Sequence, residues 1–248
     1  MGTEIQEVRR TLAAGLPVPD AAFDAHLPEA QRLASARFWT PATVALRMAH
    51  RLTEAGATRV LDFGSGAGKA CVVGALASPL TFLGVEHRPH LVPVARALAD
   101  AFGVADRVTF EAGGFEAAET ADFDALYLFN PFGEHQFTAP GHLDETVPFS
   151  RRGFEQDVAR LEHLLRRASV GLQLVTYNGF GGRIPDTFDL LRAEVADGCP
   201  LRHWRKARGR SAGGYWLELE DATLHRRLHA EDLSLPLEPE ATAAPQPT

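Results

Sequence analysis

Three glycines at alternate positions follow an apolar run that ends in an acid, in the stretch VLDFGSGAGK from Val60 to Lys69. Glycine-rich turns between a strand and a helix bind several kinds of nucleotide, and their spacing distinguishes them. Gly64, Gly66 and Gly68 form G-x-G-x-G, whereas the dinucleotide fingerprint is G-x-G-x-x-G. A P-loop would need Gly at Phe63 and Ser or Thr at Ala70. The spacing therefore matches neither phosphate-binding pattern.

The acid of this stretch, Asp62, stands two residues before the first glycine. A carboxylate at the end of a strand repels a pyrophosphate and attracts a cation. The residues up to Gly68 resemble the first motif of the class I S-adenosylmethionine-dependent methyltransferases, an acid followed by G-x-G-x-G. The resemblance implies that Ser65 and the three glycines approach the methionine part of S-adenosylmethionine. It also implies that Asp62 orients the ammonium group of that cofactor, and that S-adenosylhomocysteine is the product.

A second acid, Glu86 in FLGVEHRP, stands about twenty residues further on, at the end of the expected second strand. In the family that it resembles, an acid at this position accepts hydrogen bonds from both ribose hydroxyls. The family often has an Asp after the third strand that accepts from the adenine amino group, but here Gly114 stands there. Glu116 or a backbone carbonyl could replace that Asp. Phe115 is expected to line the adenine pocket, and a structural role for its ring is equally open.

The expected fourth strand ends in LFNPFGE, and Asn130-Pro131-Phe132 resembles the N-P-P-Y/F motif of methyltransferases that act on amino groups of adenine or glutamine. There the Asn oxygen and a Pro carbonyl accept from the target nitrogen, and the aromatic ring stacks on the planar group. Only one proline is present here, so a plain Asn-Pro turn remains an alternative. Glu134 is the candidate base if the acceptor atom is oxygen.

Upstream, FWTP (Phe38–Pro41) resembles an aromatic-Thr-Pro element that closes over the methionine end in some adenine methyltransferases. Thr40 is therefore a candidate cofactor contact. The alternative is that Thr40 caps a helix whose first residue is Pro41 and which ends near Gly56.

Two further groups of residues invite a functional interpretation. The long segment 131–150 carries the candidate bases His135, His142, Asp144 and Glu145, in no spacing typical of a metal site. The basic stretch 202–210 surrounds Trp204 and could contact a nucleic acid, or it could protect a sheet edge from aggregation.

The order of elements after residue 55 is strand then helix, repeated, which predicts an α/β fold. We expect a Rossmann-like, seven-stranded, mostly parallel sheet with helices on both faces, a C-terminal antiparallel hairpin and an N-terminal helical extension. The hairpin is expected to join 201–208 to 214–220, and 186–196 is expected to be helical. The expected strands are 60–63, 80–86, 107–113, 123–130 and 170–177, and the expected helices are 69–77, 90–103 and 154–168.

The composition of the chain argues against several classes of protein. The chain has 248 residues, 45% of them hydrophobic, and a net charge of −7, which opposes binding to duplex DNA. Cys71 and Cys199 are too few for a disulfide framework. The charged start and the lack of a long apolar run predict a cytoplasmic protein without a membrane anchor. We expect a helical extension or lid over 1–40, a methyltransferase domain over 41–235 and a disordered tail over 236–248.

The sequence thus predicts a methyltransferase that favours a nitrogen acceptor, whether a protein side chain, a nucleobase or a small molecule. The alternatives are an O-methyltransferase of a small molecule, a non-catalytic cofactor-binding module, and an NAD-dependent oxidoreductase with an irregular fingerprint. The acceptor and the oligomeric state are not specified by any motif.

Overall fold

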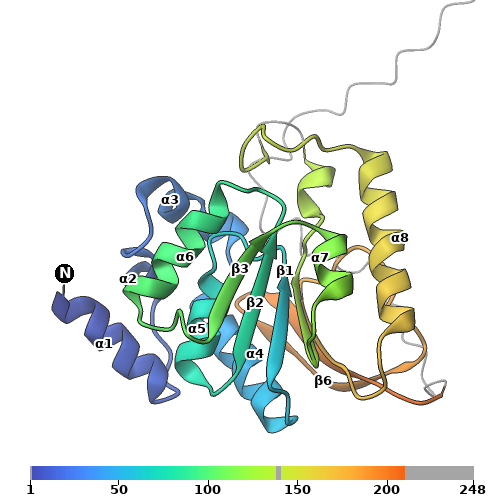
Figure 1. Ribbon diagram of the computed structural model, residues 1–248, viewed down its shortest axis with the longest axis horizontal. Helices are drawn as coiled ribbons and strands as arrows, with labels where there is room; N and C mark the ends of the chain where they lie inside the picture. The colour runs from blue at the N-terminus through green and yellow to red at the C-terminus, as the bar shows by residue number, and fades with distance from the viewer. Residues whose placement is uncertain (1, 138–140, 210–248) are drawn as a thin grey trace, which may run out of the picture. The chain divides into compact units, whose positions relative to one another are not determined.

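The computed structural model describes residues 2–137 and 141–209, and a seven-stranded sheet forms their centre (Figure 1). The strand order is β3-β2-β1-β4-β5-β7-β6, with β7 antiparallel to both of its neighbours and the remaining pairs parallel. The predicted mostly parallel sheet with a C-terminal antiparallel hairpin is confirmed. The strands are β1 (Arg59–Phe63), β2 (Thr81–Glu86), β3 (Val108–Ala112), β4 (Ala125–Phe129), β5 (Gln173–Tyr177), β6 (Phe188–Ala196) and β7 (Cys199–Lys206).

Helices cover both faces of this sheet, as predicted. On one face lie α4 (Ala42–Glu54), α5 (Lys69–Ala77) and α6 (Leu91–Ala101), and on the other lie α7 (Phe115–Thr120) and α8 (Arg151–Arg167) (Figure 1). Every residue of β5 and the first four residues of β4 are buried, because side chains on both faces of a central parallel strand meet helices. The strand order reverses between β1 and β4, and this is where ligands bind in open α/β sheets.

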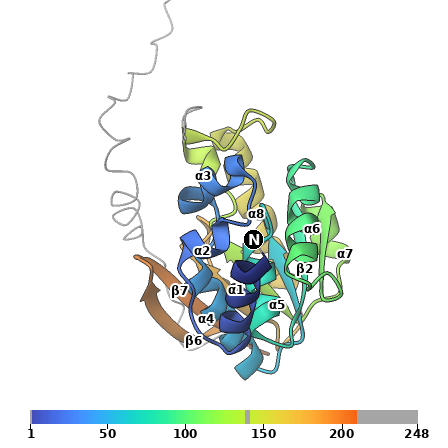
Figure 2. The same ribbon diagram turned by 90° about the vertical axis from the view of Figure 1, so that its left-hand side faces the viewer.

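The first part of the chain forms three helices, α1 (Gly2–Ala13), α2 (Asp20–Asp24) and α3 (Glu29–Phe38), on the α4–α5 side of the sheet (Figure 2). Helix α1 packs against α5, and α2 packs against α4. The ammonium of Lys69, the first residue of α5, lies 2.6 Å from Asp20 and 2.7 Å from Asp24, and it donates to the hydroxyl of Ser35. One buried cation therefore joins α2 and α3 to the start of α5.

The interpretation of Thr40 as a helix cap is wrong. Helix α4 begins at Ala42, one residue later than predicted, and its Ala42 N–H donates to Asp20 Oδ1 at 2.7 Å. The Thr40 hydroxyl instead lies 3.0 Å from the hydroxyl of Tyr127 on β4. A carboxylate from α2 thus occupies the position that a local cap would fill.

The predicted helix over 186–196 is also wrong, because Phe188–Ala196 is the edge strand β6. It joins β7 through Asp197 and Gly198, both of which have positive φ angles (48° and 81°). Such a two-residue Asp-Gly connection suits a tight hairpin. The predicted strand 201–208 corresponds to β7, whereas its predicted partner, 214–220, and the predicted tail, 236–248, lie outside the described residues.

No helix in the described parts of the chain combines the length and the apolar character that a bilayer crossing requires.

Candidate functional site

The turn between β1 and α5 depends on glycine for its shape. Gly64, Gly66 and Gly68 have φ angles of 86°, 54° and 83°, in the left-handed region that other residues rarely adopt. A β-carbon on Gly66 would lie 2.3 Å from the ring of Trp39, and one on Gly68 would lie 2.6 Å from the ring of Phe110. The alternate glycines therefore permit both the backbone conformation and the close approach of neighbouring rings.

Asp62, near the end of β1, is a buried carboxyl group, and the thiol of Cys71 donates to its Oδ2 at 3.2 Å. Burial raises the pKa of Asp62 to about 7; the thiol opposes the rise, and the charge of Glu86 adds to it. Because no basic side chain within residues 2–137 and 141–209 forms an ion pair with Asp62, a positively charged ligand would stabilise its ionised form.

Glu86, the last residue of β2, is also buried and supports the glycine turn. Its Oε2 accepts from the N–H of Gly66 at 2.7 Å, and its Oε1 accepts from the N–H of Arg88 at 2.9 Å. Each carboxylate oxygen has a second lone pair, so both oxygens keep the capacity to accept from a diol. Glu86 thus fixes the turn without using all of its hydrogen-bonding capacity.

A cavity of about 330 Å³ opens beyond the carboxyl ends of β1 to β4; Phe63 and His87, which follow the two acids, line it, whereas Asp62 and Glu86 do not. Aromatic rings form much of its wall: Phe63 and Phe115 lie 4.8 Å apart between ring centroids, and Phe115 and Phe132 are stacked at 6.0 Å. The opposite wall comes from Val147–Phe149 and from α8. The residues that line the cavity are Phe63, Gly64, Val85, His87, Gly113, Gly114, Phe115, Glu116, Pro131, Phe132, His135, Val147, Pro148, Phe149, Gly153, Asp157 and Arg160.

The residues after β4 lie at the edge of this cavity. Asn130 has a left-handed φ of 36°, and its N–H donates to Gly179 O, which joins the ends of β4 and β5. Pro131 lines the cavity, and Phe132 is buried against the other rings. Pro131 and Phe132 thus line the cavity, whereas Asn130 lies at the end of β4 with its amide group against Gly133 and is not among the lining residues.

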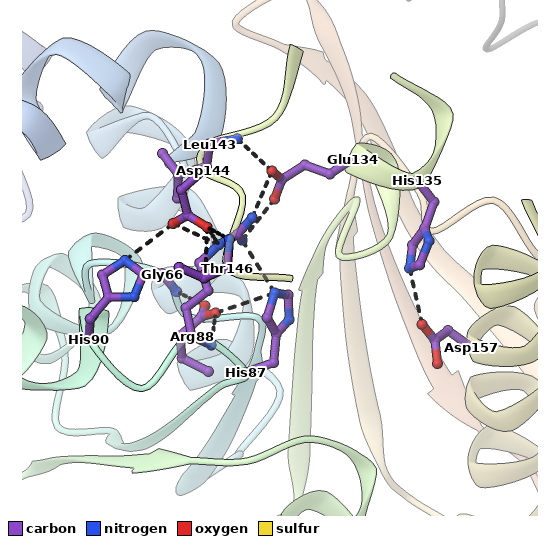
Figure 3. Close-up of polar contacts among 11 residues, drawn as sticks. Gly66, His87, Arg88, His90, Glu134, His135, Leu143, Asp144, Thr146 and Asp157 are labelled. Carbon is purple, nitrogen blue, oxygen red and sulfur yellow. Dashed lines mark hydrogen bonds and ion pairs between the residues drawn. The ribbon is translucent and has the colours of Figure 1, made fainter. Parts of the chain in front are cut away.

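Glu134 takes part in an ion-pair network that the sequence does not reveal (Figure 3). Both of its oxygens accept from the guanidinium of Arg88 at 2.9 Å, and Oε1 also accepts from the N–H of Leu143 at 2.7 Å. Asp144 contacts the same buried guanidinium and also His90. Arg88 therefore holds the segment after β4 against the end of β2, and the Glu134 carboxylate is already paired.

Thr40 and Trp39 lie at the other side of the glycine turn. Together with Asp62, Ser65 and Lys69, they border a second, much smaller cavity of about 10 Å³. The Trp39 indole N–H donates to Gln31 O at 2.8 Å, which fixes the ring to α3. The Ser65 hydroxyl is buried and makes no hydrogen bond within the described residues.

The loop histidines have neighbours within the protein. His135 lies 3.2 Å from Asp157 Oδ2 on α8, and its Nδ1 lies 3.1 Å from the N–H of Ser150. His142 Nε2 lies 3.0 Å from Phe137 O, so its ring points into the loop. Within residues 2–137 and 141–209, no three His, Cys, Asp or Glu side chains gather as a metal site would require.

The basic stretch on β7 lacks an exposed ring. Trp204 is buried, and Lys206 donates to Leu165 O, to Arg166 O and to the Thr187 hydroxyl. Arg205 lies on an exposed face, 4.0 Å from Asp189. A base could not stack on Trp204 here without unfolding this part of the sheet.

Solved structures with a similar fold include two methyltransferases. The RNA methyltransferase from Salinibacter ruber, solved in complex with S-adenosyl-L-homocysteine, matches 71% of this chain and 99% of its own, with 21% identity and a TM-score of 0.50. A putative O-methyltransferase from Klebsiella pneumoniae matches 81% of this chain and 96% of its own, with 15% identity and a TM-score of 0.52. No family model and no curated protein matches the sequence. The chain thus has the fold of the class I methyltransferases, as the resemblance predicted.

Proposed function

We propose that this chain, which has the class I methyltransferase fold, is an S-adenosylmethionine-dependent methyltransferase that acts on a nitrogen acceptor. The observation that carries the proposal is the arrangement of two buried acids, Asp62 and Glu86, at the ends of adjacent parallel strands. The left-handed glycines follow Asp62 in sequence, and Phe63 and His87, the residues after the two acids, line the aromatic cavity.

The residues present suit the cofactor. The Asp62 carboxyl group, whose pKa burial has raised, would gain an ammonium partner, and Glu86 retains lone pairs for two ribose hydroxyls. Thr40, Gly64 and Ser65 border the small cavity on the proposed methionine side, and Gly66 and Gly68 shape the turn next to it. Phe115 lines the cavity that would take the adenosine. When bound, S-adenosylmethionine supplies a methyl group activated by a positively charged sulfur.

The acceptor side of the proposal rests on the residues after β4. Asn130 and Pro131 would accept hydrogen bonds from an amino group, and Phe132 would limit the directions from which that group approaches. These residues would contribute to catalysis by orienting the acceptor, not by removing a proton from it. A strong base is not required when a neutral amine attacks. Arg88 and Leu143 already donate hydrogen bonds to Glu134. We therefore expect its carboxylate to hold the segment after β4 in place rather than to act as a base on an oxygen acceptor.

The test of cofactor binding is calorimetric titration with S-adenosylhomocysteine. The wild type should bind one equivalent, and Glu86→Gln should weaken the binding about tenfold or more, because an amide cannot accept on both sides. Glu111→Gln, on the exposed part of β3, is the matched control and should leave the affinity unchanged. Absence of binding to the wild type would contradict the proposal, and NADH would then test the oxidoreductase alternative.

The test of the acceptor atom is a mass-spectrometric screen of amine and hydroxyl acceptors with the cofactor-bound protein. Methyl transfer to amines, lost in Asn130→Ala, supports the nitrogen assignment. Transfer to hydroxyl groups alone would favour an O-methyltransferase, and tight binding without any transfer would favour a non-catalytic binding module. The boundaries at residues 40 and 235 and a cytoplasmic location stay predictions.

A further inference from the structure

The adenine end of the cavity has Gly114 at the position where the family that the sequence resembles often has an Asp. Gly114 follows β3 and has no side chain, and the N–H of Gly113 already donates to Glu86 O. An adenine ring that entered the cavity would present an exocyclic amino group, which needs an acceptor when water is excluded. The acceptor must therefore come from another element.

Two acidic residues line the cavity, Glu116 and Asp157. The carboxylate of Glu116 is largely exposed, at 77%, and it accepts from the guanidinium of Arg160 at 2.8 Å, so its charge is directed to solvent and to an existing partner. Asp157 is half-buried and lies one turn before Arg160 on α8. Of the two, Asp157 is the acid that can face a ligand.

His135 holds the Asp157 carboxylate in place (Figure 3). His135 Nε2 lies 3.2 Å from Asp157 Oδ2, and Nδ1 lies 3.1 Å from Ser150 N and 3.0 Å from Ser150 O. With its proton on Nε2, the ring donates to Asp157 and Nδ1 accepts from the N–H of Ser150. Asp157 Oδ1 makes no hydrogen bond to any residue in the part of the chain that the structure describes. One oxygen is thus anchored and the other is available at the cavity wall.

We propose that Asp157 accepts a hydrogen bond from the exocyclic amino group of adenine, and that it thereby makes the cavity specific for an adenine nucleoside. This inference rests on the proposed function, because it assumes that the adenosine part of the cofactor occupies the cavity of about 330 Å³. The side chain that would recognise adenine thus comes from α8, which follows β4, rather than from the turn after β3. His135 is a positioning residue for it.

The test compares S-adenosylhomocysteine with S-inosylhomocysteine by calorimetry. The inosine analogue presents a carbonyl oxygen where adenine presents the amino group, so it would face the carboxylate with a second acceptor. The wild type should prefer the adenosine ligand by about tenfold or more. Asp157→Asn should narrow the preference to within about threefold, because an amide can donate to the carbonyl as well as accept from the amine.

Glu116→Gln is the matched control, since it removes the other acid of the same cavity and should leave the preference unchanged. Asp157→Ser, which shortens the side chain, should also lose the preference, and thermal unfolding should show that all variants remain folded. An unchanged preference in folded Asp157→Asn, or no preference in the wild type, would overturn the inference while leaving the proposed function intact. A wild type that binds neither ligand would overturn both.

Discussion

The thiol of Cys71 lies 3.2 Å from Oδ2 of Asp62, so the first turn of α5 supplies a hydrogen-bond donor to a buried carboxyl group at the end of β1. A thiol is a weak donor and carries no positive charge. It therefore offsets only a small part of the cost of burying the carboxylate, and the pKa of Asp62 stays near 7. This pair makes the ionisation of Asp62 sensitive to what binds beside it.

The raised pKa of Asp62 predicts a dependence of stability on pH. Between about pH 4 and pH 7 the folded protein keeps a proton on Asp62 that the unfolded chain has lost, so the contribution of this group to the free energy of unfolding falls as the pH rises. We expect the stability of the wild type relative to Asp62→Asn to fall by about 2 kcal/mol between pH 5 and pH 7. Urea unfolding of both proteins at these two pH values measures the difference, and a constant difference would contradict the prediction.

Lys69 should be essential for stability. Lys69→Met leaves Asp24 buried, and Asp20 partly buried, without their cation, and we expect a loss of about 3 kcal/mol in the free energy of unfolding. Arg47→Met is the control, because Arg47 is half-exposed and its pair with Glu194 should contribute less than about 1 kcal/mol. Denaturant unfolding compares the two variants, and equal losses would refute the role given to Lys69.

Gly66 should accept no side chain without loss of cofactor binding. In Gly66→Ala the new methyl group meets the ring of Trp39 and the backbone stays in the left-handed region, so we expect affinity for S-adenosylhomocysteine to fall about tenfold or more. Gly56→Ala is the control: it has the same backbone strain (φ 78°), but no atom beyond its chain neighbours lies within 4 Å of the new carbon. It should lower stability and leave the affinity unchanged; an equal loss of affinity in both variants would contradict the steric explanation.

Trp39 should report on cofactor binding. The cavity of about 10 Å³ beside Asp62 and Ser65 is too small for an amino acid, so we expect Trp39 and the end of α3, which border it, to shift when the methionine part enters. We expect S-adenosylhomocysteine to change the tryptophan fluorescence of the wild type and of Trp204→Phe, and to leave that of Trp39→Phe almost unchanged. A signal that persists without Trp39 would contradict this movement.

Much of the fold could be predicted from the sequence, since apolar runs such as ALYLF of β4 have the character of buried parallel strands. The error at β6 has a local cause. FDLLRAEVA contains good helix formers, yet Asp197-Gly198 immediately after it forms a tight turn that pairs it with β7. The Asp-Gly pair is the sequence feature that indicates a hairpin at this point. Pairing with β7 then outweighs the helix propensity of the preceding residues.

The site was predictable only where its residues are close in sequence. The glycine turn and Glu86 follow from short motifs, whereas the pairing of Arg88 with Glu134 and the presence of Asp157 at the cavity depend on contacts between distant elements. Thr40 shows the same limit, because nothing local indicates that Asp20 takes over the start of α4. Long-range ion pairs of this kind have no periodic signature in a single sequence.

The contacts of Lys69 with Asp20, Asp24 and Ser35 also affect how the N-terminal helices fold during translation. A ribosome releases α1, α2 and α3 before α5, so during translation the carboxylates of Asp20 and Asp24 remain hydrated, with no cation to bury them. The N-terminal helices can reach their final positions only after α5 has emerged. Helices α2 and α3 thus gain this stabilising partner only after Lys69 has been made, and a nascent chain that stalls before Lys69 would expose them to proteases.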